Sequence, residues 1–240
     1  MKFFGIEKIE DPQGVKRMYK ELVARGTRRL NEMGFSPDGD AGDVSIRDPE
    51  TGYIYVSGSP KMRPNTYRNL SEYRDSDMAV VDPDGNYIVP WAGATCELPM
   101  HLAIMKARPD INCIVHTHAI WSSAWAICGK NIPLVIVEQH EHLGGEIVCA
   151  PFELVGSEAV GTSVVKALGK HKYAALLGSH GAVAIGTDLD DAFNNATFLE
   201  AIAEKAWLSY KLGDMRVVKP EDLYDPSIQD ELLHPLTDED

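Results

Sequence analysis

Three histidines in two short motifs could hold a metal ion. His116 and His118 follow the apolar residues 111–115, and His180 follows the apolar residues 173–177. In extended backbone, residues i and i+2 point to the same side, so His116 and His118 would present two imidazole nitrogens to one point. If the two strands lie near each other, His180 completes a set of neutral imidazoles with an open fourth position. Such a set is typical of a catalytic zinc site, although two surface histidines and one core histidine would give the same pattern.

Glu97 is a candidate acid or base. It precedes a helix that the sequence predicts over residues 98–107. A carboxylate in the first turn of a helix is stabilised by the helix dipole, which would explain Glu97 without any function. Beside a metal ion and apolar walls, the same carboxyl could instead be tuned for proton transfer. The local pattern leaves both interpretations open.

A second histidine pair occurs in the segment His140-Glu141-His142, just before Gly144. Its spacing again predicts two rings on one face of a strand. The pair could support the metal ligands, serve as an acid/base pair for the substrate, or be an exposed polar strand end. Glu138 is close enough in the sequence to orient either histidine.

The net charge argues against nucleic acid and membrane partners. The chain carries 23 basic and 36 acidic residues, a net charge of −13. Residues 214–240 hold nine acids and two bases, a net of −7, which leaves −6 for the remainder. No basic stripe is available to release counterions from a polyanion. Each apolar run is shorter than the ~18 residues that a membrane span needs. We therefore expect a small-molecule substrate, no nucleic acid and no membrane.

The cysteines indicate a reducing compartment. Their spacing matches neither a zinc knuckle nor a redox motif. The N-terminal residues 1–7 include acids and lack the long apolar core of a secretory signal. We expect reduced thiols in a cytoplasmic protein. The four cysteines are Cys96, Cys113, Cys128 and Cys149.

The elements that must position these residues alternate between helix and strand. Hydrophobic periodicity predicts helices over 15–33, 98–107, 120–128, 157–168 (capped by Ser157) and 189–212. Strands are expected at 53–57, 78–81, 87–89, 111–115, 134–137, 147–150, 173–177 and 183–185, with a turn-rich loop over 36–42. The interleaved order predicts an α/β fold with one central sheet. We expect one domain over residues 1–213, followed by an acidic C-terminal tail over 214–240.

Four phrases together resemble the class II aldolase/adducin family, which includes fuculose phosphate aldolase and ribulose phosphate 4-epimerase. The phrases are Glu97 with His101, Val115-His116-Thr117-His118-Ala119, Gly144-Gly145 leading to Cys149-Ala150-Pro151, and Leu176-Leu177-Gly178-Ser179-His180-Gly181. The likeness runs over residues 15–212. It implies a three-layer α/β/α fold with one central mixed sheet. It also implies a homotetramer of C4 symmetry with active sites between subunits.

The resemblance assigns roles to the chemical residues. Those that match the family's metal ligands are His116, His118 and His180, and the residue that matches its proton shuttle is Glu97. The expected cofactor is Zn²⁺, or another divalent metal such as Mn²⁺ or Co²⁺. A hydroxyl beside a carbonyl can chelate such a metal, which acts as a Lewis acid and stabilises an enediolate.

The resulting expectation is a carbon–carbon lyase that performs retro-aldol cleavage of a small, sugar-like hydroxy-carbonyl compound. The alternative is a metal-dependent decarboxylase of a hydroxy or aromatic acid, because decarboxylation needs the same electron sink. Less expected are a sugar phosphate 4-epimerase and a non-catalytic adducin-like module. Epimerases of the family carry aspartate at the position of Glu97.

Three departures from the family pattern affect the expected substrate. The usual Ser-Gly-Asn phosphate loop reads Ala-Gly-Asp over residues 41–43, and an aspartate there would repel a phosphate. The family's paired serines are Thr95-Cys96 here, whereas Ser57-Gly58 is kept. The family's general-acid tyrosine falls at Val137, so His142 or a tail tyrosine such as Tyr224 would replace it. The expected substrate-binding residues are Gly42, Asp43, Ser57, Gly58, Thr95, Cys96, Arg63 (an anion partner) and His140.

Overall fold

One mixed β-sheet forms the centre of the molecule in this computed structural model, which describes residues 14–59, 61–63, 66–89, 93–219 and 222–223. The strand order is β6-β5-β2-β1-β7-β10-β9-β8, and neighbours are antiparallel except the parallel pair β8 and β9. The strands are β1 (Asp43–Arg47), β2 (Ile54–Val56), β5 (Ala79–Val81), β6 (Tyr87–Val89), β7 (Cys113–Thr117), β8 (Cys149–Ala150), β9 (Ala174–Leu177) and β10 (Gly181–Gly186). A separate hairpin pairs β3 (Lys61–Arg63) with β4 (Thr66–Tyr67).

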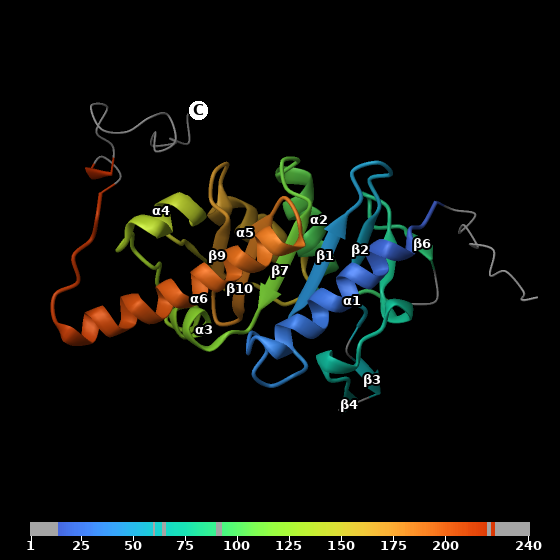
Figure 1. Ribbon diagram of the computed structural model, residues 1–240, viewed down its shortest axis with the longest axis horizontal. Helices are drawn as coiled ribbons and strands as arrows, with labels where there is room; N and C mark the ends of the chain where they lie inside the picture. The colour runs from blue at the N-terminus through green and yellow to red at the C-terminus, as the bar shows by residue number, and fades with distance from the viewer. Residues whose placement is uncertain (1–13, 60, 64–65, 90–92, 220–221, 224–240) are drawn as a thin grey trace, which may run out of the picture.

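Helices cover both faces of this sheet, and the expected three-layer α/β/α fold is confirmed. In Figure 1, α1 and α6 lie in front of the strands, and α2 and α5 lie behind them. Helices α3 and α4 pack against α6 at one end. The helices are α1 (Arg17–Glu32), α2 (Leu98–Ala107), α3 (Ile120–Ile127), α4 (Val137–Leu143), α5 (Glu158–Leu168) and α6 (Leu189–Leu212), with short 3-10 helices at Leu70–Glu72 and Asp75–Asp77.

Alternation along the central strands divides the core into two sides. Val44 and Val115 belong to the apolar cluster under α1 and α6, whereas Ile114 belongs to the cluster under α2 and α5. Successive side chains of a strand point to opposite faces. Asp43 and His116, which stand opposite each other in the pairing of β1 with β7, therefore share the face that α2 covers.

The predicted strand over residues 134–137 is wrong. Residues 134–136 are irregular and Val137 begins α4. The reason is the buried side chain of Gln139, whose amide donates to the carbonyls of Ile132, Pro133 and Gly145 and accepts from the Val135 N–H. Within the predicted strand, this side chain pairs the Val135 N–H, and the Gln139 N–H donates to the Ile136 carbonyl at the start of α4. The segment therefore leads into a helix instead of pairing as a strand.

Other expectations differ in detail. Strand β1 was not predicted, although it is the sheet's link between β2 and β7. The strands expected at 78–81 and 87–89 are present as β5 and β6, which pair with each other in antiparallel fashion. Ser157 stands at the N-cap of α5, but its hydroxyl makes no capping bond and finds no partner within the described chain. No helix in the described ranges is long and apolar enough to cross a bilayer.

The start of the acidic tail lies against the α6 side of the molecule. Met215 packs on the apolar cluster that α3 and α6 share, and the Val218 N–H donates to the Leu134 carbonyl at 2.8 Å. The boundary at residue 213 stays a prediction. Tyr224 lies outside the described residues.

Candidate metal centre

The pairing of β7 with β10 brings the three histidines together. His116 stands opposite Val183, so the end of β7 lies beside the turn that carries His180. The potential ligand nitrogens of His116, His118 and His180 all lie within 4.8 Å of one another. The Nε2 atoms of His116 and His118 are 3.1 Å apart. The convergence expected from the i, i+2 spacing and from strand adjacency is therefore present.

Burial keeps these imidazoles in the form that binds metals. His116 is only 1% exposed, and its Nδ1–H donates to the Ala182 carbonyl at 3.0 Å, which leaves Nε2 free to bind a metal. Desolvation by burial lowers the pKa of each ring, His116, His118 and His180, to about 4. The rings are thus neutral at physiological pH, as metal ligation requires.

A tight turn sets the position of His180. The His180 N–H donates to the Leu177 carbonyl at 3.0 Å, and the Ser179 N–H donates to the Ala126 carbonyl at 2.9 Å. Ser179 has φ 54°, the one positive value at a non-glycine position in the described residues. A Cβ on Gly178 would lie 2.8 Å from the Ala150 carbonyl oxygen, so only glycine fits there. A strained conformation held by such contacts is common at ligand-binding turns.

Glu97 lies beside the three histidines, at the N-terminal end of α2. It is the N-cap residue of α2, is 4% exposed, and its Oε1 lies 3.6 Å from His180 Nε2. Burial, reinforced by the charge of Asp43, raises the pKa of Glu97 to about 8. Its Oε2 is buried and has no hydrogen-bond partner among the described residues. Neutral imidazoles beside an unpartnered carboxyl oxygen fit a divalent cation, which would supply the missing positive charge.

Asp43 is buried close to the histidines and is fully engaged. Its Oδ1 accepts from His101 Nε2 at 2.7 Å and its Oδ2 accepts from the Thr95 hydroxyl at 2.6 Å. Burial alone would raise the pKa of Asp43, but the charge and hydrogen bond of His101 hold it well below its usual range. The preceding Gly42 has φ 99°, and a Cβ there would lie 2.8 Å from the His116 carbonyl oxygen.

In the second predicted phosphate loop, at Ser57-Gly58, the serine hydroxyl is hydrogen-bonded to groups inside the fold. Ser57 Oγ lies 2.7 Å from Thr27 Oγ1 and accepts from the Val44 N–H at 2.9 Å. A Cβ on Gly58 would collide with the Asp77 carbonyl oxygen. Cys96 is exposed next to Glu97. Arg63 lies in β3, and its side chain is outside the described part of the structure.

Within one chain, His140 and His142 do not join the histidine site. They lie on helix α4 instead of a strand, so their i, i+2 spacing does not place them on one face. The Leu143 carbonyl accepts from the N–H of Tyr173, which precedes β9, whereas His180 follows the other end of that strand. His142 stacks on Phe198 with ring centroids 3.8 Å apart. The proposed roles of both histidines stay predictions.

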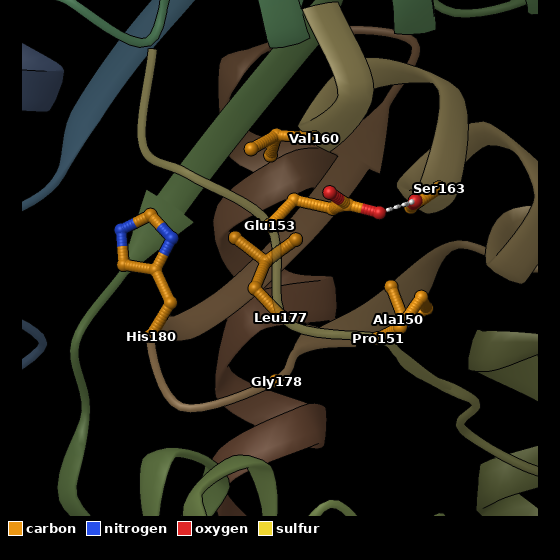
Figure 2. A pocket seen from close by; sticks show the side chains of 8 residues that line it. All are labelled: Ala150, Pro151, Glu153, Val160, Ser163, Leu177, Gly178 and His180. Carbon is orange, nitrogen blue, oxygen red and sulfur yellow. Dashed lines mark hydrogen bonds between the residues drawn. The ribbon is translucent and has the colours of Figure 1, made fainter. Parts of the chain in front are cut away.

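Sequence reasoning assigned no role to a small recess beside His180. Figure 2 shows Glu153 directed away from His180 toward Ser163, whose hydroxyl donates to Glu153 at 3.3 Å. The recess has a volume of about 10 Å³, room for roughly one water molecule. No local motif marks Glu153, because its position depends on the loop between β8 and α5. The apolar and remaining lining residues are Ala150, Pro151, Val160, Leu177 and Gly178.

Curated proteins with similar sequences act on sugar phosphates. L-ribulose-5-phosphate 4-epimerase UlaF of Salmonella paratyphi C is 29% identical over 178 residues, which cover 70% of this chain and 75% of that protein. The 5-deoxy-D-ribulose 1-phosphate aldolase of Bacillus thuringiensis serovar kurstaki is 28% identical over 203 residues, which cover 85% of this chain and 90% of that protein. These relatives include both an epimerase and an aldolase.

Solved structures share the fold. An L-fuculose 1-phosphate aldolase superposes with a TM-score of 0.80 at 23% identity, covering 88% of this chain and 95% of that one. YgbL of Escherichia coli, named as a candidate aldolase, epimerase or decarboxylase, gives 0.68 at 24% identity, covering 86% of this chain and 96% of that one. The model of the class II aldolase and adducin N-terminal domain matches residues 21–207. The chain therefore belongs to the class II aldolase and adducin N-terminal domain family.

Proposed function

We propose that this protein is a divalent-metal-dependent lyase that cleaves a small hydroxy-carbonyl compound by a retro-aldol reaction. One observation carries the proposal: three neutral imidazoles, one buried and two half-buried, converge beside the carboxyl of Glu97, whose Oε2 lacks a partner among the described residues. The metal would be held by His116, His118 and His180, with Zn²⁺ the first choice and Mn²⁺ or Co²⁺ the alternatives. When bound, the cation would act as a Lewis acid on the substrate carbonyl.

Glu97 can move the proton that this reaction requires. In retro-aldol cleavage, a base removes the proton of the β-hydroxyl group, the carbon–carbon bond breaks, and its electron pair is left on the fragment that contains the original carbonyl. The same proton can then return to the carbon of that fragment. Its position supports this role, because Glu97 Oε1 lies 3.6 Å from His180 Nε2 and can take up and release a proton beside the bound substrate.

The substrate that we propose is unphosphorylated. The carboxylate of Asp43 is taken by His101 and Thr95, and the hydroxyl of Ser57 is taken by Thr27 and Val44. These loops thus offer an incoming phosphate few free side-chain donors, and Asp43 adds a negative charge close by. Because the related proteins are named for sugar phosphates, the test should compare the activity on matched phosphorylated and unphosphorylated substrates.

Epimerisation has support from the relatives named as L-ribulose-5-phosphate 4-epimerases, and decarboxylation shares the same electron sink. The products separate the three reactions. Retro-aldol cleavage yields an aldehyde and a carbonyl fragment, decarboxylation releases carbon dioxide, and epimerisation conserves the carbon skeleton. His140 and His142 lie away from the histidine site within one chain, so a role for them in either reaction stays a prediction.

The decisive experiment combines metal loading with a partial reaction. Protein stripped by a chelator would be reloaded with Zn²⁺, Mn²⁺ or Co²⁺ and incubated with dihydroxyacetone in D₂O. We expect metal-dependent exchange of a carbon-bound proton, and cleavage of longer hydroxy-carbonyl compounds. Glu97→Gln should retain the metal and lose roughly 10²–10⁴-fold in rate. An exchange rate that stays the same without metal and in Glu97→Gln would contradict the proposal.

We also propose a cytoplasmic homotetramer. Large apolar side chains are exposed on α3 and α6, among them Ile120, Ile127 and Leu212, and they support burial between subunits. The four cysteines are free, which supports a reducing compartment. Light scattering should give four times the chain mass of 26.4 kDa. A monomer at micromolar concentration would contradict the assembly.

A further inference from the structure

A chain of buried hydrogen bonds joins strand β1 to the residue before α2. Asp43 lies at its centre, because one carboxylate oxygen contacts His101 Nε2 at 2.7 Å and the other contacts the Thr95 hydroxyl at 2.6 Å. On the far side, His101 Nδ1 lies 2.6 Å from Ser45 Oγ. All four side chains are at most 5% exposed. Asp43 and Ser45 are two residues apart on β1, which places them on the same face.

The direction of these bonds follows from chemistry. An ionised carboxylate has only acceptors, so both His101 Nε2 and the Thr95 hydroxyl must donate to Asp43. The Thr95 hydroxyl oxygen is then left to accept, and it takes the Glu97 N–H at 3.2 Å. The network therefore ends on the main chain of Glu97.

Glu97 is held at its carbonyl end as well. The His101 N–H donates to the Glu97 carbonyl at 3.3 Å, in the first turn of α2. That bond, like the 2.9 Å bond from the Met100 N–H, belongs to the first helical turn, so the side-chain restraint on the Glu97 main chain comes from Thr95. Asp43 anchors both Thr95 and the ring of His101, and through that ring the first turn of α2. A carboxyl that must reach the histidine site would need this restraint, because its own Oε2 has no hydrogen-bond partner in the described structure.

Packing alone does not account for these residues. A buried charge with polar partners costs desolvation energy, and apolar residues of similar volume often pack as stably. The cluster of buried residues around the network is apolar and includes Ile114 of β7 and Met100 of α2. Apolar side chains at these positions would avoid the desolvation cost of the polar network. The network is therefore explained better by the geometry it gives to the site than by its contribution to stability.

We propose that Asp43, His101 and Thr95 are positioning residues, which fix the backbone of Glu97 so that its carboxyl stays directed at the three histidines. The expected effect on kcat rests on the proposed lyase function. The expected position of the Glu97 carboxyl does not depend on that function. Asp43 and Thr95 then act through Glu97, in contrast to the substrate-binding roles that the family pattern predicts for them.

A matched pair of substitutions tests the proposal. Thr95→Val keeps the shape of the side chain and removes the hydroxyl, whereas Thr95→Ser keeps the hydroxyl. We expect Thr95→Val to lower kcat by roughly 10- to 100-fold, with KM and metal content within about twofold of wild type. Thr95→Ser should recover most of the lost kcat. Asp43→Asn, which leaves one amide N–H₂ facing a donor, should resemble Thr95→Val.

A double-mutant cycle separates positioning from direct substrate contact. If Thr95 acts through Glu97, Thr95→Val should cost little further rate in a Glu97→Gln background, so the two effects are not additive. Additive effects, a large rise in KM, or failure of Thr95→Ser to rescue the rate would overturn the proposal.

A crystallographic readout keeps the test independent of activity. The structures of metal-loaded Thr95→Val and Thr95→Ser should differ in the position of the Glu97 carboxyl, with displacement in the valine variant alone. If the Glu97 carboxyl does not move in Thr95→Val, the positioning claim is overturned, whatever the activity of that variant. If wild-type protein shows no proton exchange or cleavage with any metal, the proposed function fails, and the crystal comparison still decides the positioning.

Discussion

Glu97 links the chemistry of the site to the pH dependence of folding. In the metal-free folded protein, burial raises the pKa of Glu97 from its ordinary value of 4.5 to about 8, so the folded state binds this proton more tightly than the unfolded state does. Stability from this group is fully present below pH 4.5 and is lost as the pH rises through 8.

Glu97→Gln should therefore stabilise the metal-free protein in a pH-dependent way. Relative to wild type, we expect a gain in unfolding free energy that is roughly 2 to 4 kcal/mol larger at pH 9 than at pH 5. Urea denaturation in the presence of a chelator measures it. Glu72→Gln, at an exposed position of a 3-10 helix, is the control. The same difference at both pH values would contradict the raised pKa of Glu97.

The histidines should bind metal in acid better than free imidazole does. Because burial lowers the pKa of His116, His118 and His180 to about 4, protons do not compete for the ligand nitrogens until the pH falls well below 6. In Glu97→Gln, where no carboxyl titrates beside the rings, Co²⁺ affinity measured by absorbance should change less than about threefold between pH 7.5 and 5.5. A loss of tenfold or more per pH unit in this range would show ordinary imidazoles.

At the scale of single elements, the turn before β10 stores strain at Ser179. A β-branched residue tolerates a positive φ poorly, whereas glycine adopts it without steric cost. We expect Ser179→Val to destabilise the protein by about 1 to 3 kcal/mol, and Ser179→Gly to be neutral or stabilising by up to about 1 kcal/mol. Chemical denaturation gives both values. Equal stabilities for valine and glycine would show that Ser179 does not hold the left-handed conformation.

Helix α4 depends on one amide side chain. Gln139 contacts four backbone groups of the surrounding loop and is fully buried. Gln139→Ala should lower the unfolding free energy by roughly 2 to 4 kcal/mol, because those groups lose their partners. Gln139→Glu, which has nearly the same shape but cannot donate, should be at least as harmful. A change below about 0.5 kcal/mol would mean that water replaces the amide.

Regular elements with strong periodicity could be predicted from the sequence, and elements that depend on tertiary partners could not. The long helices and the strands before His116 and His180 carry continuous apolar patterns. Strand β1 was missed because Asp43 and Ser45 make its pattern polar on the face where they bind His101. The apolar residues 134–137 suggested a strand, yet Gln139 pairs the Val135 N–H and the preceding carbonyls of Ile132 and Pro133, a contact that no local pattern shows.

The convergence of the three histidines was predictable for a related reason. Local spacing fixed His116 and His118, and a glycine-flanked turn after an apolar strand marked His180. The engagement of Asp43, Thr95 and Ser57 was not predictable, because it depends on which side chains lie opposite them in three dimensions. His140 and His142 were placed on a strand, and their helix turns them apart.

For the whole molecule, metal binding and folding should be coupled. The three histidines of the proposed site come from two segments of the chain, and only the folded state brings them together. Zn²⁺ at 100 times its dissociation constant should raise the unfolding free energy by about 2.7 kcal/mol. Thermal denaturation with and without chelator measures the shift in Tm, and His180→Ala should abolish it. An unchanged Tm on Zn²⁺ addition would contradict a site formed by folding.

The antiparallel register of β7 and β10 has a further consequence for how the chain reaches its native state. A slip of one residue would invert every side chain of β10 and carry the adjoining turn about 3.3 Å along the sheet. His180 would then be separated from the two histidines that end β7. A chain with the shifted register would lack the complete histidine set, so a bound cation would not stabilise it. Metal binding at the proposed site would therefore stabilise only the native register of β7 and β10.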